Sequence, residues 1–376
     1  MDYSREERYF IWLASVDGVG PVTFSSLLNI FGTPEAVFTG APKNRAALEG
    51  VPRFGVKGAQ TLLKACDDAY LDGFFANLQQ KGIEAVCKLN EQYPKRLLEV
   101  FAPPLVLYCK GRKELLGHER TIAVIGTREP TPYGRNVAGK IARVLGENGV
   151  CVVSGMARGI DICAHLGALE GKGDTVAVLG NGADIPYPAN KAFVYEQICR
   201  EGLVISEYIP GTQPAPGNFP ARNRIISGLA LGVVVVEAGE KSGTNITVNY
   251  ALEQGRDIFA VPGSITSRTS VSTNLLIKSG CEVITGEEDV LEYYGWAGRT
   301  RKPGYVVKAK DAPPVQLTFQ ERMLTDALEM GGKSFDQLYE LTQFSMPELF
   351  TLLAELELKG IVAQQPGRVY VLAGSA

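Results

Sequence analysis

Glycines and single cations gather directly after several short apolar runs of this sequence. The residues concerned are Gly126, Thr127, Arg128, Gly155, Arg158, Phe219, Arg222, Asn223, Arg224, Lys241, Ser242 and Gly243. Glycine lets a backbone approach a ligand closely, and helix starts expose free N–H groups. Phosphate is the ligand that uses both such N–H groups and isolated cations. These residues therefore indicate a site for phosphate groups.

The apolar runs that precede these residues are typical of buried strands. They cover Thr121–Gly126, Val150–Gly155, Thr175–Gly180, Leu203–Ser206, Gly232–Glu237, Ile258–Val261 and Cys281–Ile284. Runs that are apolar on both faces predict a parallel sheet covered by helices, and helical patterns separate them here. We therefore expect a Rossmann-like, doubly wound α/β fold over residues 121–286, within a domain that spans residues 91–296. Because ligands of such sheets bind beyond the carboxyl ends of the strands, the glycines and cations should meet at one edge.

The motifs narrow the kind of phosphate ligand. The chain has no G-x-x-x-x-G-K-[ST] segment and no G-x-G-x-x-G turn after the first strand, which disfavours a P-loop and the usual dinucleotide site. No Ser-His-Asp or Cys-His arrangement is apparent, and the chain has only two histidines, His118 and His165. Phe219 lies beside two arginines, and an exposed ring next to cations suits base stacking on a single strand.

Structural roles remain open for several of these residues. Arg222 or Arg224 could form an ion pair with Glu207 or Glu237, and Phe219 could belong to the core. Asp161 could cap a helix or orient a loop. His165, early in the helix after Gly159, is better placed for a structural hydrogen bond than for catalysis.

Two helical segments flank the central domain. Residues 1–90 are helical with glycine-rich turns at Gly18–Pro21 and Gly50–Gly58, which suits either a helix-hairpin-helix (SAM-like) domain or a small helical bundle. Residues 297–314 form a basic linker with Arg299, Arg301, Lys302, Lys308 and Lys310. Residues 315–376 predict a winged helix: helices at 321–329, 335–342 and 346–359, then a strand, a turn at 366–368 and a strand. With 4 cations against 8 acids, this last domain is a poor reader of duplex DNA, so we expect it to make protein contacts.

Bulk properties exclude several classes of protein. The net charge is -3, so a polyanion site must be a local concentration of cations. Seven scattered cysteines without a CxxC pair argue against a structural zinc site, and we expect no metal and no cofactor. No run of 18 apolar residues and no secretory signal occurs, so we expect a cytosolic protein without membrane contact.

The ordered motifs closely resemble those of the DNA processing protein A family (DprA, also called Smf). They include Tyr93-Pro94, Ala123–Arg128, Ser154–Asp161, Phe219–Ser227, Ser242-Gly243 and Val261–Gly263. The resemblance implies a non-enzymatic homodimer that binds single-stranded DNA and loads the RecA recombinase during natural transformation. Among the twelve residues named first, the resemblance maps Arg128, Phe219, Arg222, Arg224 and Lys241 to DNA contacts. The chain departs from the family pattern at Asn245 and Ser272, which leaves the loop geometry there open.

Two other functions compete with this expectation. Related Rossmann-like folds hydrolyse nucleoside monophosphates with a glycine-rich loop and a glutamate, for which Glu237 and Glu240 are the candidates. A pure adaptor protein with a vestigial pocket is the other alternative.

Overall fold

The computed structural model describes residues 3–52, 54–297, 317–329, 331–359, 361–365 and 369–372. The chain divides into two compact units, Met1–Arg299 and Thr300–Ala376, which are described separately. Within the described residues, no helix is long and apolar enough to cross a membrane. The linker expected over residues 297–314, apart from Ala297, and the turn at 366–368 lie outside the described residues.

Six helices form the amino-terminal part of the first unit. They are α1 (Arg5–Ser15), α2 (Pro21–Phe31), α3 (Pro34–Gly40), α4 (Arg45–Glu49), α5 (Gly55–Ala65) and α6 (Asp68–Gln80). Ser4 and Glu7 form a capping box at the start of α1, which satisfies N–H groups that a helix start leaves free. The Trp12 ring is fully buried and donates to the Ala65 carbonyl oxygen over 2.8 Å, which ties α1 to the end of α5.

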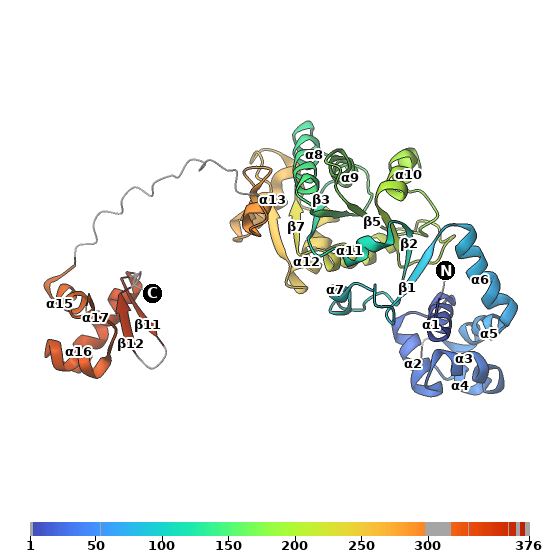
Figure 1. The fold of residues 1–376 in the computed structure, drawn as a ribbon, viewed down its shortest axis with the longest axis horizontal. Coiled ribbons are helices and arrows are strands. Elements are labelled where there is room, and N and C mark those ends of the chain that lie inside the picture. The colour runs from blue at the N-terminus through green and yellow to red at the C-terminus, as the bar shows by residue number, and fades with distance from the viewer. Residues whose placement is uncertain are drawn as a thin grey trace. The chain divides into compact units, whose positions relative to one another are not determined.

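A nine-stranded sheet forms the centre of the unit, in the order β1-β2-β6-β5-β4-β3-β7-β8-β9 (Figure 1). The strands are β1 (Glu84–Cys87), β2 (Val106–Gly111), β3 (Thr121–Ile125), β4 (Cys151–Ser154), β5 (Thr175–Leu179), β6 (Leu203–Ser206), β7 (Gly232–Val235), β8 (Asp257–Ala260) and β9 (Glu282–Val283). β1, β2 and β6 pair antiparallel, and all pairs from β6 to β9 are parallel. The expected mostly parallel, doubly wound sheet is confirmed.

Helices cover both faces of this sheet, as Figure 1 shows. The connecting helices are α7 (Lys95–Leu98), α8 (Pro132–Glu147), α9 (Ile160–Glu170), α10 (Ala192–Glu201), α11 (Asn218–Leu229), α12 (Thr244–Glu253), α13 (Val271–Lys278) and α14 (Asp289–Tyr293). α8 and α9 pack in the core of one face, and α7, α11 and α12 pack in the core of the other. Short 3-10 turns lie at Ala41–Lys43 (η1), Lys113–Gly117 (η2), Ala189–Lys191 (η3) and Arg268–Ser270 (η4).

The expected boundary at residue 90 falls after a strand of the central sheet. β1 lies within the segment expected to be helical, and it pairs with β2. The core of the six helices also includes Tyr108, Leu179 and Val204 from the sheet. The helical segment is therefore packed on the edge formed by β1, β2 and β6 through a shared hydrophobic core.

The carboxyl-terminal unit is a winged helix, as expected. Its elements are α15 (Phe319–Glu329), β10 (Lys333–Ser334), α16 (Phe335–Thr342), α17 (Met346–Leu358), β11 (Val362–Gln365) and β12 (Val369–Leu372). The three strands pair in the order β10-β12-β11. Buried leucines from all three helices, among them Leu324, Leu338 and Leu353, form a core of its own.

Candidate nucleic-acid interface

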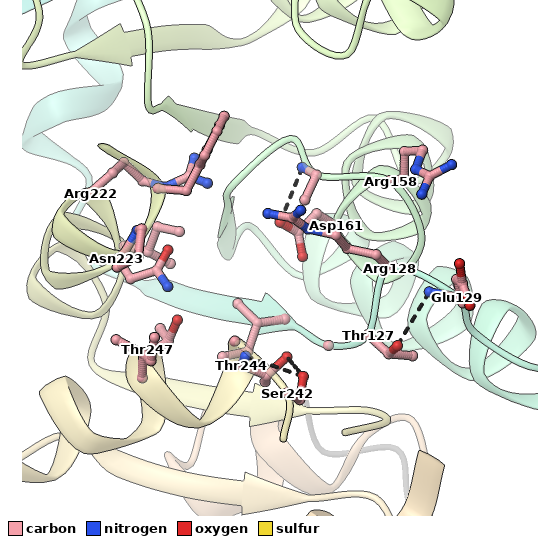
Figure 2. A pocket seen from close by; sticks show the side chains of 18 of the residues that line it. Thr127, Arg128, Glu129, Arg158, Asp161, Arg222, Asn223, Ser242, Thr244 and Thr247 are labelled. Carbon is pink, nitrogen blue, oxygen red and sulfur yellow. Dashed lines mark hydrogen bonds between the residues drawn. The ribbon is translucent and has the colours of Figure 1, made fainter. Parts of the chain in front are cut away.

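A pocket of about 620 Å³ opens at the carboxyl ends of β3, β4 and β7. The chain runs from β3 to β6 on one side of β3 and then crosses to β7 on the other side. This change of direction is the place where open α/β sheets bind ligands. The first turns of α11 and α12 also line this carboxyl-end pocket, so two helix starts, which attract anions, face it. Figure 2 shows the lining side chains.

Two loops bring arginines together at the mouth of the pocket. The Ile160 N–H donates to the Thr127 carbonyl oxygen over 3.2 Å, which joins the loop after β3 to the loop after β4. Gly159 makes this contact possible, because its φ is +89° and a Cβ atom there would collide with that same oxygen. Arg128 and Arg158, one from each loop, are both exposed and line the pocket.

Neither of these two rim arginines, Arg128 and Arg158, is neutralised. Among the described residues, no side chain forms a hydrogen bond or an ion pair with either guanidinium group. The carboxylates that line the pocket belong to Glu129 and Asp161. An exposed pair of uncompensated cations beside two helix starts is a site for anions.

Arg222 occupies a different place from the one the sequence suggested. It lines the floor of the pocket, and the residue is only 4% exposed. Its Nη1 donates to the carbonyl oxygens of Gly155, over 2.7 Å, and of Val178. Burial lowers the pKa of Arg222 to about 10, partly offset by the nearby Asp161 charge. Arg222 therefore joins β4 to β5 beneath the pocket.

Asp161 completes this buried floor. Its Oδ2 accepts from the backbone N–H groups of Gly155 and Ala157, over 3.1 and 3.2 Å. A Cβ atom at Gly155 would lie 2.8 Å from both the Arg222 guanidinium and this oxygen, so only glycine fits between the two charges. Burial raises the pKa of Asp161 to about 6, while Arg222 acts in the opposite direction. The loop-orienting role left open for Asp161 is the one that the structure shows.

Arg224 forms the structural ion pair that the sequence left open. Its two Nη atoms donate to the two carboxylate oxygens of Glu207 over 2.7 and 2.6 Å, and its Nε donates to the Ala102 carbonyl oxygen. The residue is 9% exposed and does not line the carboxyl-end pocket. It anchors α11 to the segment after β6.

An aromatic pair extends the pocket wall. The rings of Phe219 and Tyr187 are stacked with their centroids 5.2 Å apart, and both residues line the pocket. The Arg128 guanidinium carbon lies 5.7 Å from the centre of the Phe219 ring. Phe219 is only half-buried, so a flat group can reach this assembly. Tyr187 was missed in the sequence because 32 residues separate it from Phe219 and no local pattern joins them.

Hydroxyl and amide groups line the opposite wall. Ser242 and Gly243 precede α12, and Thr244 and Thr247 lie in its first turn, where all four line the pocket together with Asn223 of α11. Neither threonine was among the predicted DNA contacts, although Thr244 follows Gly243 directly. Of the twelve predicted residues, nine line the pocket, whereas Gly155, Arg224 and Lys241 do not. Lys241 is exposed on the turn just before Ser242.

The glutamates proposed for hydrolysis do not face this pocket. Glu237 is 2% exposed, and its carboxylate accepts from the Thr131 N–H, the Thr131 hydroxyl and the Thr269 hydroxyl. Glu240 is exposed but is not a lining residue. Within the described part of the chain, no group of three His, Cys, Asp or Glu side chains could hold a metal ion.

The first helix-hairpin-helix turn faces elsewhere. Residues 16–20 line a separate pocket of about 420 Å³ together with Glu207 and Tyr208. Its charged side chains are the acids Asp17 and Glu207, of which Glu207 is paired with Arg224. Among the described residues, this wall offers a phosphate group no free cation.

The two departures from the family pattern contact each other. The Asn245 amide donates to the Ser272 hydroxyl over 3.2 Å, and that hydroxyl donates to the Gly239 carbonyl oxygen over 2.8 Å. The two polar residues thus hold the loop after β7 against the start of α13.

Comparisons with known proteins agree across the whole chain. A family model described as DNA recombination-mediator protein A matches residues 84–295. Models for the DprA winged helix domain and a SAM-like helix-hairpin-helix tandem match residues 308–368 and 10–68. Protein Smf of Synechocystis is 34% identical over 98% of this chain and 99% of its own length. DNA processing protein DprA of Streptococcus pneumoniae is 42% identical over 60% of this chain and 77% of its own.

Two solved structures are similar as well. The X-ray structure of DprA from Streptococcus pneumoniae superimposes with a TM-score of 0.64 at 34% identity, covering 78% of this chain and 98% of that one. DNA processing protein A from Helicobacter pylori, whose structure is described by its single-stranded DNA binding mode, has a TM-score of 0.52 at 32% identity. That match covers 56% of this chain and 95% of the other.

Proposed function

The chain belongs to the DNA recombination-mediator protein A (DprA/Smf) family, and we propose that it binds single-stranded DNA in the carboxyl-end pocket and loads RecA onto that strand. The observation that carries the proposal is the pair of exposed, uncompensated rim arginines, Arg128 and Arg158, beside a stacked aromatic pair. Cations track a phosphate backbone, and aromatic rings stack on bases.

The pocket favours a single strand over a duplex. Its Phe219 and Tyr187 rings line a concave space of about 620 Å³, between helix starts and loop arginines. A base reaches such rings only when it is unpaired and turned out of a stack, which costs little in a single strand. The Ser242–Thr244 turn before and at the start of α12 lies on the facing wall, where a helix start suits a phosphate.

The partners in this proposal follow from family membership. We infer that the protein acts as a homodimer and delivers RecA to DNA taken up in natural transformation, which places it in the cytosol. It needs no cofactor for this work, since the energy comes from binding. The residues proposed to contact DNA directly are the predicted lining residues other than the buried Arg222, together with Tyr187 and Thr244.

The double variant Arg128→Ala/Arg158→Ala tests the DNA contact. Each lost charge-assisted contact costs about 1.5 kcal/mol or more, so affinity for a fluorescent oligothymidine should fall roughly 100-fold. Fluorescence anisotropy at two salt concentrations measures it, and the variant should also show a shallower salt dependence. Arg143→Ala/Arg200→Ala on α8 and α10, outside the pocket, is the matched control. Affinity within threefold of the unmodified protein would contradict the proposal.

RecA loading has a separate readout. The protein should accelerate RecA assembly on the same oligonucleotide, and RecA's DNA-dependent ATPase activity measures this assembly. The double variant should not accelerate RecA assembly, whereas the control variant should accelerate it as the unmodified protein does. Normal DNA binding without any RecA stimulation would leave the binding site standing and remove the loading function.

A further inference from the structure

A second pocket, of about 320 Å³, opens at the opposite end of the same strands. It lies where β3, β4 and β5 begin, between α7, η2 and the last residue of α11. The DNA site proposed above is at the carboxyl ends of the strands, so the two pockets lie at opposite edges of the sheet. The motif that starts at Tyr93-Pro94 builds this amino-end pocket, and the DNA site makes no use of that motif.

The interior of the amino-end pocket is aliphatic. Leu115, Leu116, Val153, Val176 and Leu229 line it, and all five are buried members of the core on that face of the sheet. The Tyr93 hydroxyl donates to the Pro104 carbonyl oxygen over 2.6 Å, which turns this polar group away to the backbone. A volume near 300 Å³ is at the lower end of the range for ligand pockets, so one compact apolar group fits.

The mouth of this pocket holds a guanidinium that has no ion-pair partner among the described residues. The Arg96 guanidinium donates only to neutral oxygens, the Thr121 hydroxyl over 3.1 Å and the Glu119 carbonyl over 2.6 Å. Among the described residues, no carboxylate oxygen lies within 4.0 Å of it. Burial lowers the pKa of Arg96 and the neighbouring Arg256 lowers it further, whereas the carboxylates of Glu119 and Glu99 offset this in part. A partly buried cation beside another cation gains most from a bound anion.

Neighbouring arginines show that this arrangement is unusual in the molecule. Arg112, on the loop before η2, contacts carboxylate oxygens of both Glu114 and Asp174. Arg224, which is more deeply buried than Arg96, holds Glu207 with both of its Nη atoms. Of these three arginines, Arg96 alone faces a pocket and lacks a carboxylate within the described residues.

His118 adds a second unsatisfied group to the same wall. Its Nδ1 is buried and has no hydrogen-bond partner within the described residues. Its Nε2 lies 3.8 Å from an Asp174 oxygen, so the two ring nitrogens face different surroundings. An unpaired buried nitrogen costs stability unless a ligand or a water satisfies it.

The remaining charges restrict the kind of anion. Lys95 adds a positive charge to the rim, whereas Glu91 and Glu119 add two negative charges. A nucleic-acid backbone would bring further phosphates against these carboxylates, which repel it. The aliphatic interior and a guanidinium without an ion-pair partner suit one negative charge on an apolar body.

We propose that the amino-end pocket binds a monocarboxylate that carries a compact aliphatic or aromatic group. The carboxylate accepts from Arg96 beside the His118 ring, and the apolar group fills the space above Val153, Val176 and Leu229. The same chemistry is offered by a free branched-chain carboxylic acid and by the carboxyl terminus of a protein that ends in a leucine-like residue.

The two histidines of the chain provide the measurement. His118 lines the pocket, whereas His165 is fully buried in α9 and serves as the internal reference. With the imidazole Cε1 labelled by carbon-13, the full chain is titrated with isocaproate and with its neutral amide. The acid should shift the His118 resonance alone, and the amide should bind at least about tenfold more weakly, since it lacks the charge-assisted contact.

Variants localise the effect. Arg96→Gln should weaken isocaproate binding about tenfold or more, and Leu116→Phe should block it by filling the space. Arg120→Gln is the matched control, because this adjacent arginine is exposed and lies outside the pocket. No His118 shift at millimolar isocaproate, equal binding of acid and amide, or an unaffected Arg96→Gln variant would each overturn the proposal.

A peptide arm separates the two sources of the carboxylate. Two forms of an acetylated tetrapeptide that ends in leucine are compared, one with a free and one with an amidated carboxyl terminus. Tighter binding of the free-terminus peptide than of isocaproate identifies a protein carboxyl terminus, and the reverse order identifies a small acid. Either order supports the site, and single-stranded DNA affinity should stay unchanged in Arg96→Gln, which keeps this test independent of the proposed function.

Discussion

The carboxyl-end pocket and the helix-turn-helix of the winged helix are both built on architectures that contact nucleic acid in other proteins, yet their charges are opposite. The pocket exposes Arg128 and Arg158 without counter-charges. The segment from α16 to the end of α17, residues 335–358, has five acids and no lysine or arginine. In winged-helix relatives of the helix-turn-helix the second helix would enter the major groove, where phosphates flank it closely.

The exposed side chains sharpen this contrast. Met346 and Phe350 are one helical turn apart on α17 and are 54% and 67% exposed. The Phe350 ring lies 6.3 Å from that of Phe335 on α16, so the apolar surface continues across both helices. An acidic, apolar surface repels a polyanion and suits a protein partner. In both regions the fold supplies the shape, whereas the uncompensated charges on its surface decide which ligand binds.

Removing the buried guanidinium beneath the pocket should have the largest effect. Arg222→Met leaves Asp161 and the carbonyl oxygens of Gly155 and Val178 without their partner, so the free energy of unfolding should fall by about 3–5 kcal/mol. Chemical denaturation measures this loss. Arg128→Met at the rim is the control and should change stability by less than about 0.5 kcal/mol. Equal stabilities for the two variants would show that depth in the pocket does not separate structural from DNA-binding arginines.

This difference changes how the DNA site is tested. The double variant Arg222→Ala/Arg224→Ala would remove a buried cation and a buried ion-pair partner, so its loss of DNA binding would report on folding. The rim arginines can be removed without opening the core.

The aromatic pair should give the next largest effect. Phe219→Leu keeps an apolar group but removes the stacking face, which is worth roughly 1–3 kcal/mol per base, or about a tenfold loss of oligothymidine affinity. Anisotropy measures it. Phe350→Leu on the winged helix is the matched control and should leave affinity unchanged. A loss caused by the control but not by Phe219→Leu would reverse the roles of the two regions.

Acidification should strengthen DNA binding slightly. Asp161 has a pKa raised to about 6 by burial, so lowering the pH through 6 removes a negative charge from the pocket wall. Oligothymidine affinity should therefore rise about threefold between pH 7 and pH 5.5, since one charge is lost at partial burial. Asp161→Asn should bind with the higher affinity at both values. An equal rise in Asp161→Asn would assign the effect to another group.

The same group makes stability change with pH in the same direction as DNA affinity. Its folded-state pKa lies above the ordinary value of 3.8, so the folded state holds the proton more tightly. The contribution of Asp161 to stability is thus full below about pH 4 and is lost as the pH rises through about 6.

Deletion of the winged helix should have the smallest effect. Removing Gln316–Ala376 takes away 4 cations and 8 acids, so single-strand affinity should change by less than about twofold. The two units have separate cores, and the truncated chain should stay folded. Anisotropy with the same oligonucleotide checks this prediction. A tenfold loss would show that the winged helix contacts DNA in spite of its charge.

The sequence was most informative where the signal is local. Each strand expected from Thr121 to Ile284 is present within one or two residues of its predicted start, and all three helices of the winged helix are present. Short apolar runs and helical periodicity are properties of neighbouring residues, so they can be recognised without the fold. The glycine positions after β3 and β7 were found in the same way.

The sequence was least informative where a residue's environment comes from distant segments. β1 and β2 were both absent from the expected sheet, because these two strands join it only by pairing antiparallel with each other and with β6. Tyr187 and the amino-end pocket were also missed, since their neighbours come from several separate segments.

By itself, the sequence determined which glycines, arginines and hydroxyl groups follow which strand. Since parallel strands end at one edge, it also determined that these residues meet. Only the tertiary structure decided what each arginine does there. Arg128, Arg222 and Arg224 are the same residue type, and burial and pairing with Gly155, Val178 and Glu207 separate a free cation from two structural ones. Those partners are set by packing between elements, which no spacing along the chain records.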